Sequence, residues 1–299
     1  METHLVLGWT RINNNRTFSF RSGASFFFCL LFHFFFYYKC IGFFFFIAYI
    51  SLPLFFYPFN IHTISLQKKM SRRVVGNHVI LGINAVSIVA GLYGAWRIFL
   101  IELSDDLKGA GHYQFLTNLS LIYSLVVFGL GFVAHLTRSK TLYDFKNLLH
   151  PIGLALETIV AMVYWPLRLF MLHLLTPDPE NFKIPLGLDL CIHLMPVVSL
   201  LIDYLVFMPR WTIKSNTVLL LITALSTGYW CLLKYLVDTE NGGRYPYAFM
   251  DMEDDGLRAL VFVAVGLVAF LQFHFMRNIY DVVVKKAETV DIEIDRKLR

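Results

Sequence analysis

Apolar stretches long enough to cross a lipid bilayer recur along this chain of 299 residues. A membrane-spanning helix needs about 20 predominantly apolar residues. The composition agrees, because 57% of the residues are hydrophobic and 16% are charged, against about 45–50% and 25% in soluble domains. The apolar runs are continuous rather than alternating, which excludes the strand pattern of a β-barrel. The sequence therefore predicts an all-α, polytopic transmembrane helical bundle and excludes both a water-soluble domain and a disordered chain.

Six segments after Met70 are predicted to span the membrane. The short loops between them favour antiparallel packing of consecutive helices. We therefore divide the chain into an extension over 1–69, a six-span domain over 70–280 and a charged tail over 281–299. The six predicted spans are 76–101, 114–136, 151–175, 185–208, 216–237 and 256–276.

The extension over 1–69 is unlike the rest of the chain, because it holds 16 of the 29 phenylalanines. One interpretation is an additional hydrophobic anchor or hairpin. The other is that the natural protein begins at Met70, since a T-rich untranslated leader would encode runs of phenylalanine and Met70 is followed by an ordinary start, Ser71-Arg72-Arg73.

Basic residues predict the orientation, because Lys and Arg near span ends are retained in the cytosol. One side of the predicted bundle carries 15 of them and the other side 5. Both termini of the Met70 form should therefore be cytosolic, and the acidic loop over 238–255 lumenal or extracellular. We expect an integral protein of the endomembrane system, in the endoplasmic reticulum, where lipid enzymes with short spans usually reside. The basic residues form no single stripe, so nucleic acid is not an expected partner.

Several ionisable side chains lie within the predicted spans, where each costs at least about 2.5–3.5 kcal/mol. Glu157 and Arg168 share one face of the third span but lie about 16 Å apart along it, too far to pair directly. Each therefore needs a partner elsewhere. Asp203 lies at a depth similar to that of Glu157, Lys234 can snorkel to the far interface, and Pro166 is expected to kink the third span.

One threonine and one histidine enter the membrane from the lumenal side. His193 lies about 12 Å deep in the fourth span, and Thr117 lies one turn into the second. Asp189 precedes His193 by one turn and can orient or charge its ring. Threonines within membrane helices commonly serve only as hydrogen-bonding groups, so these residues alone are weak evidence for chemistry. The sequence contains no histidine cluster or CxxC motif, and we expect no metal or other cofactor.

The order of four short motifs says more about function than these single residues do. The motifs are Gln114-Phe115-Leu116-Thr117-Asn118-Leu119, Tyr164-Trp165, Asp189-Leu190-Cys191-Ile192-His193 and Tyr245-Pro246-Tyr247. Over residues 110–276 this pattern resembles the androgen-induced (FAR/AIG-like) family of multi-span membrane proteins, as a fungal-type or otherwise divergent member. Animal members are intramembrane threonine hydrolases that cleave fatty acid esters of hydroxy fatty acids.

The resemblance implies a nucleophile at Thr117 and a catalytic histidine at His193, with Asp203 matching an acidic residue ten positions later. The animal pattern has a further histidine before the catalytic one and two threonines after it. This chain has Asp189-Leu190 and Leu194-Met195 at those places, which leaves the substrate more open than the reaction.

Four further residues are candidates for supporting roles in such a reaction. Asp189 could orient His193, Asn118 or Tyr164 could stabilise an oxyanion, and Arg168 could bind a substrate carboxylate or pair with Asp189. The predicted function is hydrolysis of a lipid ester within the bilayer. The alternative is a non-enzymatic transporter or structural protein of lipid homeostasis, in which Glu157, Arg168 and Asp203 would form a relay.

Overall fold

The computed structural model describes residues 73–176, 184–252 and 254–285. The predicted extension over 1–69 and most of the charged tail lie outside the described residues. Five described helices are long and apolar enough to cross a membrane, and a bent pair makes a sixth span. The long helices are α4 (His78–Phe99), α6 (Leu116–Thr137), α7 (Lys140–Phe170), α11 (Ser215–Leu236) and α12 (Asp255–Tyr280), and the bent pair is α9 (Leu186–His193) with α10 (Met195–Ile202).

Short elements connect these spans. The π-helical turns η4 and η7 continue α10 and α12, and the remaining short helices lie in loops. Their bounds are α5 (Asp105–Lys108), η3 (His112–Gln114), α8 (Leu172–Leu175), η4 (Asp203–Phe207), η5 (Thr239–Asn241), η6 (Ala248–Met250) and η7 (Asp281–Lys285). The prediction of an all-α polytopic bundle is confirmed.

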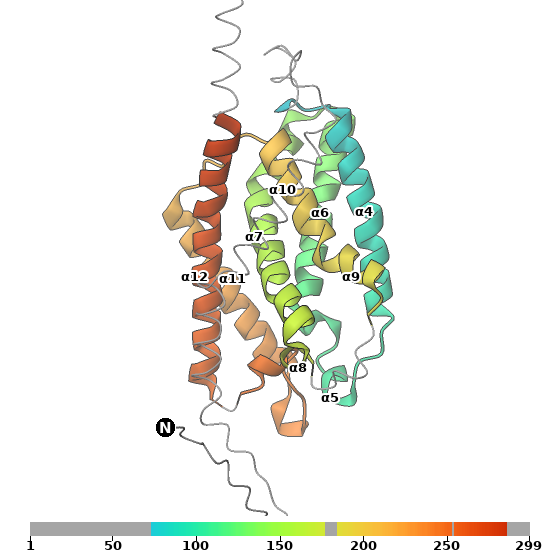
Figure 1. Cartoon of the computed structure of the whole chain (residues 1–299), viewed down its shortest axis with the longest axis vertical. Coiled ribbons are helices and arrows are strands. Elements are labelled where there is room, and N and C mark those ends of the chain that lie inside the picture. Colours follow the sequence, from blue (N-terminus) through green and yellow to red (C-terminus); the bar gives the residue numbers. More distant parts are fainter. Residues whose placement is uncertain (1–72, 177–183, 253, 286–299) are drawn as a thin grey trace, which may run out of the picture. The chain divides into compact units, whose positions relative to one another are not determined.

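Helix α7 is the centre of the bundle, and α11 is its most peripheral span. In α7, 56% of the most apolar window is buried inside the protein, against 11% in α11. α7 packs against α6, α9, α10 and α12, while α6 also packs against α4 (Figure 1). The main contact of α11 is with α12, and it touches the rest of the bundle at η3.

The third span is longer than predicted, because its helix begins at Lys140 rather than at Pro151. The Ser139 side chain accepts a hydrogen bond from the Leu142 amide and so caps the helix start. Both Pro151 and Pro166 lie inside this continuous helix.

The interruption in the bundle lies in the fourth span, between α9 and α10. The axis bends by 41° there, and Leu194 leaves the helical conformation with φ −120°. Pro196 explains the break, since it has no amide to donate to the Ile192 carbonyl and its ring clashes with that carbonyl in a regular helix. His193 is thus the last residue of a half-helix within the bundle.

Two of the ionisable residues expected in the spans are paired across helices. Lys146 Nζ lies 2.7 Å from Asp203 Oδ2, and both side chains are buried. The Ser124 hydroxyl donates to Glu157 Oε1 over 2.7 Å. Lys146 is one of the basic residues counted at the flank before the third predicted span. Because α7 already begins at Lys140, Lys146 lies within the helix and against Asp203.

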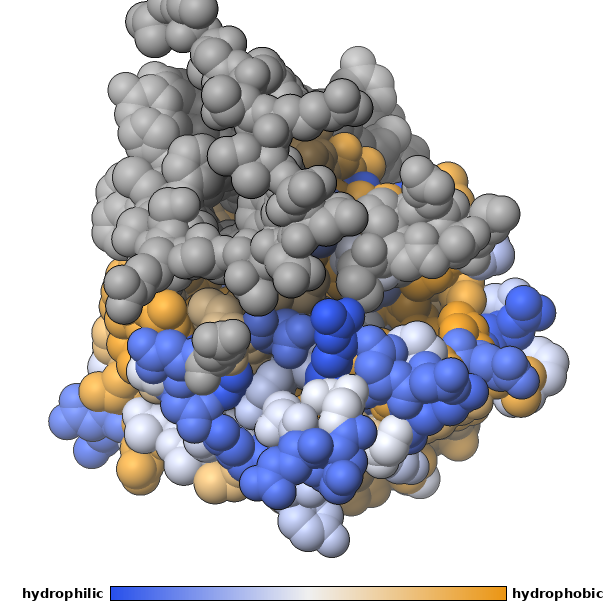
Figure 2. All heavy atoms as spheres, turned by 90° about the horizontal axis from the view of Figure 1, so that it is seen from below, coloured by the Kyte–Doolittle hydropathy of each residue, from blue (hydrophilic) through white to orange (hydrophobic). Residues whose placement is uncertain are grey.

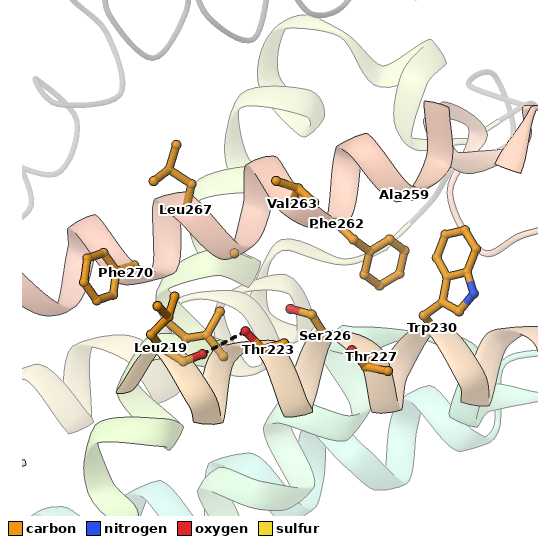
Figure 3. A pocket seen from close by; sticks show the side chains of 12 residues that line it. Leu219, Thr223, Ser226, Thr227, Trp230, Ala259, Phe262, Val263, Leu267 and Phe270 are labelled. Carbon is orange, nitrogen blue, oxygen red and sulfur yellow. Dashed lines mark hydrogen bonds between the residues drawn. The ribbon is translucent and has the colours of Figure 1, made fainter. Parts of the chain in front are cut away.

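A groove of about 470 Å³ lies between α11 and α12. Each helix lines it with residues at matching intervals of three and four, which fall on one helix face. Figure 3 shows hydroxyl groups on the α11 side and mostly apolar side chains on the α12 side. The lining residues are Leu219, Ile222, Thr223, Ser226, Thr227 and Trp230 from α11, and Ala259, Phe262, Val263, Gly266, Leu267 and Phe270 from α12.

Replacing Lys146 by methionine should destabilise the protein strongly, by about 3–5 kcal/mol, because the Asp203 carboxylate would remain buried without its partner. Lys234→Met is the matched control, since Lys234 makes an equally short but exposed ion pair with Asp255 and exposed pairs contribute little. Thermal unfolding in detergent measures both. Equal losses in the two variants would contradict the assigned importance of the buried pair.

Candidate active site

One end of the bundle, where α5, η5 and η6 lie, carries mainly acidic side chains, and we call it the acidic end. Figure 2 views this end, where hydrophilic residues gather on the exposed face and hydrophobic ones lie around the sides. The acidic residues described there are Asp105, Asp106, Asp238, Glu240, Asp251, Asp254 and Asp255. Helix α6 begins and α7 ends near it (Figure 1).

His193 is held by groups from α7 and from its own half-helix. Its Nδ1 lies 3.1 Å from Asp189 Oδ1, one helical turn back. The Tyr164 ring stacks on the imidazole at an interplanar angle of 6°, and the Trp165 indole donates to the His193 carbonyl over 3.4 Å. With Nδ1 donating to a carboxylate, the neutral ring keeps Nε2 as its proton acceptor.

The Asp189 carboxylate connects α9 to α7. It accepts hydrogen bonds from the Tyr164 hydroxyl and, over 3.4 Å, from Arg168 Nε, in addition to its contact with His193. Asp189 is almost completely buried, so these partners replace the water that an exposed carboxylate would bind. The sequence left two interpretations of Arg168, a substrate-binding group or an ion pair with Asp189, and the structure contains the ion pair.

Thr117 lies near the depth of Tyr164. The contact between Ser124 and Glu157 fixes the register of the antiparallel helices α6 and α7. Thr117 precedes Ser124 by seven residues and Tyr164 follows Glu157 by seven, so both lie about 10 Å closer to the acidic end than that contact.

Packing also brings the Thr117 face of α6 toward α9. Leu121, one turn after Thr117, packs against Leu188 and Ile192, the sequence neighbours of Asp189 and His193. The described residues contain no direct hydrogen bond between Thr117 and His193. The structure thus places the two side chains in the same region of the bundle without joining them.

The start of α6 is covered by Tyr247 from the loop before α12. Its ring packs edge-to-face on Phe115, the residue just before α6, with ring centroids 6.1 Å apart, and its phenol interacts with Thr117 and Leu116. The first backbone amides of a helix have no acceptor within the helix itself. Burial raises the pKa of the Tyr247 phenol, and the hydrogen bonds from Thr117 and Leu116 act in the opposite direction.

Asn118 and Tyr164, two of the expected oxyanion donors, make other hydrogen bonds. The Asn118 side-chain amide donates to the His112 carbonyl over 2.8 Å and so fastens the preceding loop to α6. The Tyr164 hydroxyl donates to Asp189. Within the described ranges, no group of three or more histidine, cysteine, aspartate or glutamate side chains is arranged to hold a metal ion.

Arg258 holds the loop that carries Tyr247. It is buried in the first turn of α12 and donates to the carbonyl oxygens of Met250 and Met252. Its guanidinium also lies 4.0 Å from the centre of the Tyr245 ring. The sequence indicates no functional role for Arg258, and Tyr247 stands out only as part of the motif Tyr245-Pro246-Tyr247. One sequence signal could have identified Arg258, namely its position as a cation in the first turn of a helix. The helix dipole disfavours a cation there, so other partners must stabilise it.

Most of the described chain matches the sequence model of a known protein family. Residues 83–281 match the model of the FAR-17a/AIG1-like proteins, so the chain belongs to this family. The expected resemblance is confirmed.

Two fungal proteins are among its relatives. The UPF0641 membrane protein YHR140W of Saccharomyces cerevisiae is 28% identical over 222 residues, which cover 69% of this chain and 92% of the yeast protein. The UPF0641 membrane protein PJ4664.05 of Schizosaccharomyces pombe is 28% identical over 169 residues, covering 56% of this chain and 75% of that protein. No solved structure matches the chain. The chain is accordingly an integral membrane protein of fungal-type sequence.

Arg258→Leu should loosen the loop over 244–252, because Met250 and Met252 lose the donor that fixes their carbonyl groups. Hydrogen–deuterium exchange of the full chain in detergent should become faster in that loop and remain unchanged at the centre of α7. Lys234→Leu is the control, since Lys234 contacts the same Asp255 but lies at the surface. Unchanged exchange in Arg258→Leu would contradict the role of this arginine.

Proposed function

We propose that this protein is an intramembrane lipid-ester hydrolase with Thr117 as the nucleophile and His193 as the general base. The observation that carries the proposal is the His193–Asp189 pair at the end of a half-helix, with Nε2 left as an acceptor on the side of the bundle where α6 begins. The proposed substrates are fatty acid esters of hydroxy fatty acids or related lipids. Membership of the family supports the assignment.

The reaction would proceed in two stages. The Thr117 oxygen attacks the ester carbonyl carbon while His193 Nε2 takes the hydroxyl proton, because an alcohol is a weak nucleophile without a base. The tetrahedral intermediate expels the alcohol oxygen, which receives that proton from His193. Water then attacks the acyl-threonine with its proton passing to His193, and the carboxylic acid leaves as the Thr117 hydroxyl is restored.

Asp189 would hold the imidazole in the required tautomer and stabilise the imidazolium formed at each stage, as the carboxylate of a catalytic triad does. Tyr164 and Arg168 fix that carboxylate from α7. Arg168 Nε lies 3.4 Å from Asp189, and the Arg168 side chain is 28% exposed. It could therefore also bind a carboxylate of the substrate.

The closing of Thr117 onto His193 would accompany substrate binding. Catalytic hydrogen bonds are often long in unliganded enzymes and shorten in the complex. The break at Leu194 gives α9 a separate end that can adjust against α6 without displacing α10. In cells, we propose that the acidic end faces the lumen of the endoplasmic reticulum and that both termini of the Met70 form are cytosolic.

Hydrolysis by the purified full chain tests the proposal. Thr117→Ala and His193→Ala should each lower kcat for a branched fatty acid ester by about 10³-fold or more, since each removes a group that forms or breaks bonds. Thr137→Ala and His274→Ala are the matched controls, because they change the same residue types at other places in the spans. Product release by liquid chromatography and mass spectrometry is the measurement.

A wild-type chain that is inactive toward a panel of lipid esters would contradict the hydrolase. So would a Thr117→Ala variant that keeps full activity. The alternative function, transport, is favoured by the broken fourth span and by the buried pair of Lys146 and Asp203. Insensitivity at Thr117 together with loss of function in Asp203→Asn and Glu157→Gln would favour that alternative.

The groove between α11 and α12 is proposed to hold an acyl chain of the substrate. Phe262, which lines the groove, packs in the same cluster as Tyr229 and Tyr247, and Tyr247 covers Thr117. One end of the groove therefore packs against the same cluster as the residue that covers the start of α6. Its volume falls within the range of about 300–1,000 Å³ found for ligand sites.

Gly266→Leu should fill this groove, because a Cβ at position 266 would already lie 3.3 Å from Ile222. We expect the KM for a long-chain ester to rise about tenfold, equivalent to ~1.4 kcal/mol, with little change for a short-chain ester. Gly129→Leu is the control, since a Cβ there meets open space. Equal KM values in the two variants would contradict the proposal that the groove binds the substrate.

A further inference from the structure

We infer that Tyr247 is a third catalytic residue, which donates a hydrogen bond to the oxyanion formed at the substrate carbonyl. The inference rests on the proposed hydrolysis and supplies the donor that this reaction lacks. An ester carbonyl attacked by Thr117 places its oxygen close to Thr117. The Tyr247 side chain lies at the same helix start, where its ring contacts Phe115 and its phenol interacts with Thr117.

The position of the phenol favours this role. Tyr247 is half-buried, so part of its side chain remains accessible. Its ring is held by Phe115, in an edge-to-face contact with centroids 6.1 Å apart, and by stacking on Phe249 at 5.3 Å. A rigid donor requires little reorganisation when negative charge develops on the substrate.

The start of α6 lies beside the phenol and adds further stabilisation for an oxyanion. The first backbone amides of α6 have no acceptor within the helix, and the positive end of the helix dipole favours negative charge there. The Leu116 and Thr117 amides can themselves contact the oxyanion as the substrate moves in beside the phenol.

The competing donors are less suitable. Asn118 is engaged with the His112 carbonyl and Tyr164 with Asp189. Recruiting either would break a hydrogen bond that holds the site together. Within the described residues, no carbonyl or carboxylate oxygen is seen to accept a hydrogen bond from Tyr247, so it can donate to the substrate without such a loss.

The chemical step is balanced by the groups already named. As the Thr117 oxygen forms its bond to the carbonyl carbon, the electron pair of the C=O double bond moves onto oxygen. Tyr247 keeps its proton and donates a hydrogen bond to that charge. When the alcohol leaves with the proton held by His193, the C=O bond re-forms and the hydrogen bond weakens.

Tyr247→Phe in the full chain tests the inference, because it removes the donor and keeps the ring. We expect kcat to fall about 10²–10³-fold with KM nearly unchanged. Tyr229→Phe is the matched control, since Tyr229 belongs to the same cluster but donates to the Gln114 carbonyl over 2.7 Å, and its kcat should stay near the wild-type value. Thermal unfolding in detergent shows whether each variant is folded.

Labelling by a fluorophosphonate gives a second readout, measured by peptide mass spectrometry at Thr117. The probe forms an oxyanion-like adduct, so Tyr247→Phe should be labelled at least tenfold more slowly than the wild type. If Tyr247→Phe is unstable, Tyr247→His keeps a donor on a ring and should recover part of kcat.

Three outcomes would overturn the inference. The first is an unchanged kcat in Tyr247→Phe, and the second is an equal loss in Tyr247→Phe and Tyr229→Phe. The third is a wild-type chain that neither hydrolyses esters nor reacts with the probe, which rejects the hydrolase itself. A failure confined to Tyr247 leaves wild-type hydrolysis and Thr117 labelling intact, so the two failures are distinguishable.

Discussion

The Asp189 carboxylate organises the half of the bundle that contains the candidate site. A single buried charge receives Tyr164 and Arg168 from α7 and His193 from its own half-helix. An isolated carboxylate in such surroundings would be very costly, so these contacts are required together. They tie α9 to the central helix on one side of a break that Pro196 imposes, and they determine which nitrogen of His193 remains available.

The other side of the break has its own buried ion pair. Lys146 of α7 contacts Asp203, where α10 passes into the π-helical turn η4. The two parts of the fourth span are therefore each attached to α7 by ionic contacts, although the helix between them is discontinuous. Polar groups are needed at both places because the broken backbone alone cannot fix the relative position of the two segments.

The spans are located well by the sequence, because membrane thickness requires long apolar runs whatever the tertiary packing. The start of α7 was misplaced because Pro151 looks like a helix boundary, whereas a spanning helix can accommodate proline when neighbouring groups satisfy the freed backbone. The contact of Asp189 with His193 was foreseeable from their spacing of one turn. The role of Arg258 was not, since its partners are backbone carbonyl groups that no sequence pattern identifies.

The sequence by itself determined that this chain is a polytopic helical membrane protein, to which family it belongs, and which polar residues lie inside its spans. The length of each apolar segment and the order of the short motifs can be read along the chain, and they do not depend on how the helices are arranged. Only the tertiary structure decided that Arg168 serves Asp189, that Lys146 is buried against Asp203, and that Tyr247 lies over Thr117. These pairings depend on helix register and loop path, which are set by the packing of distant segments against α7.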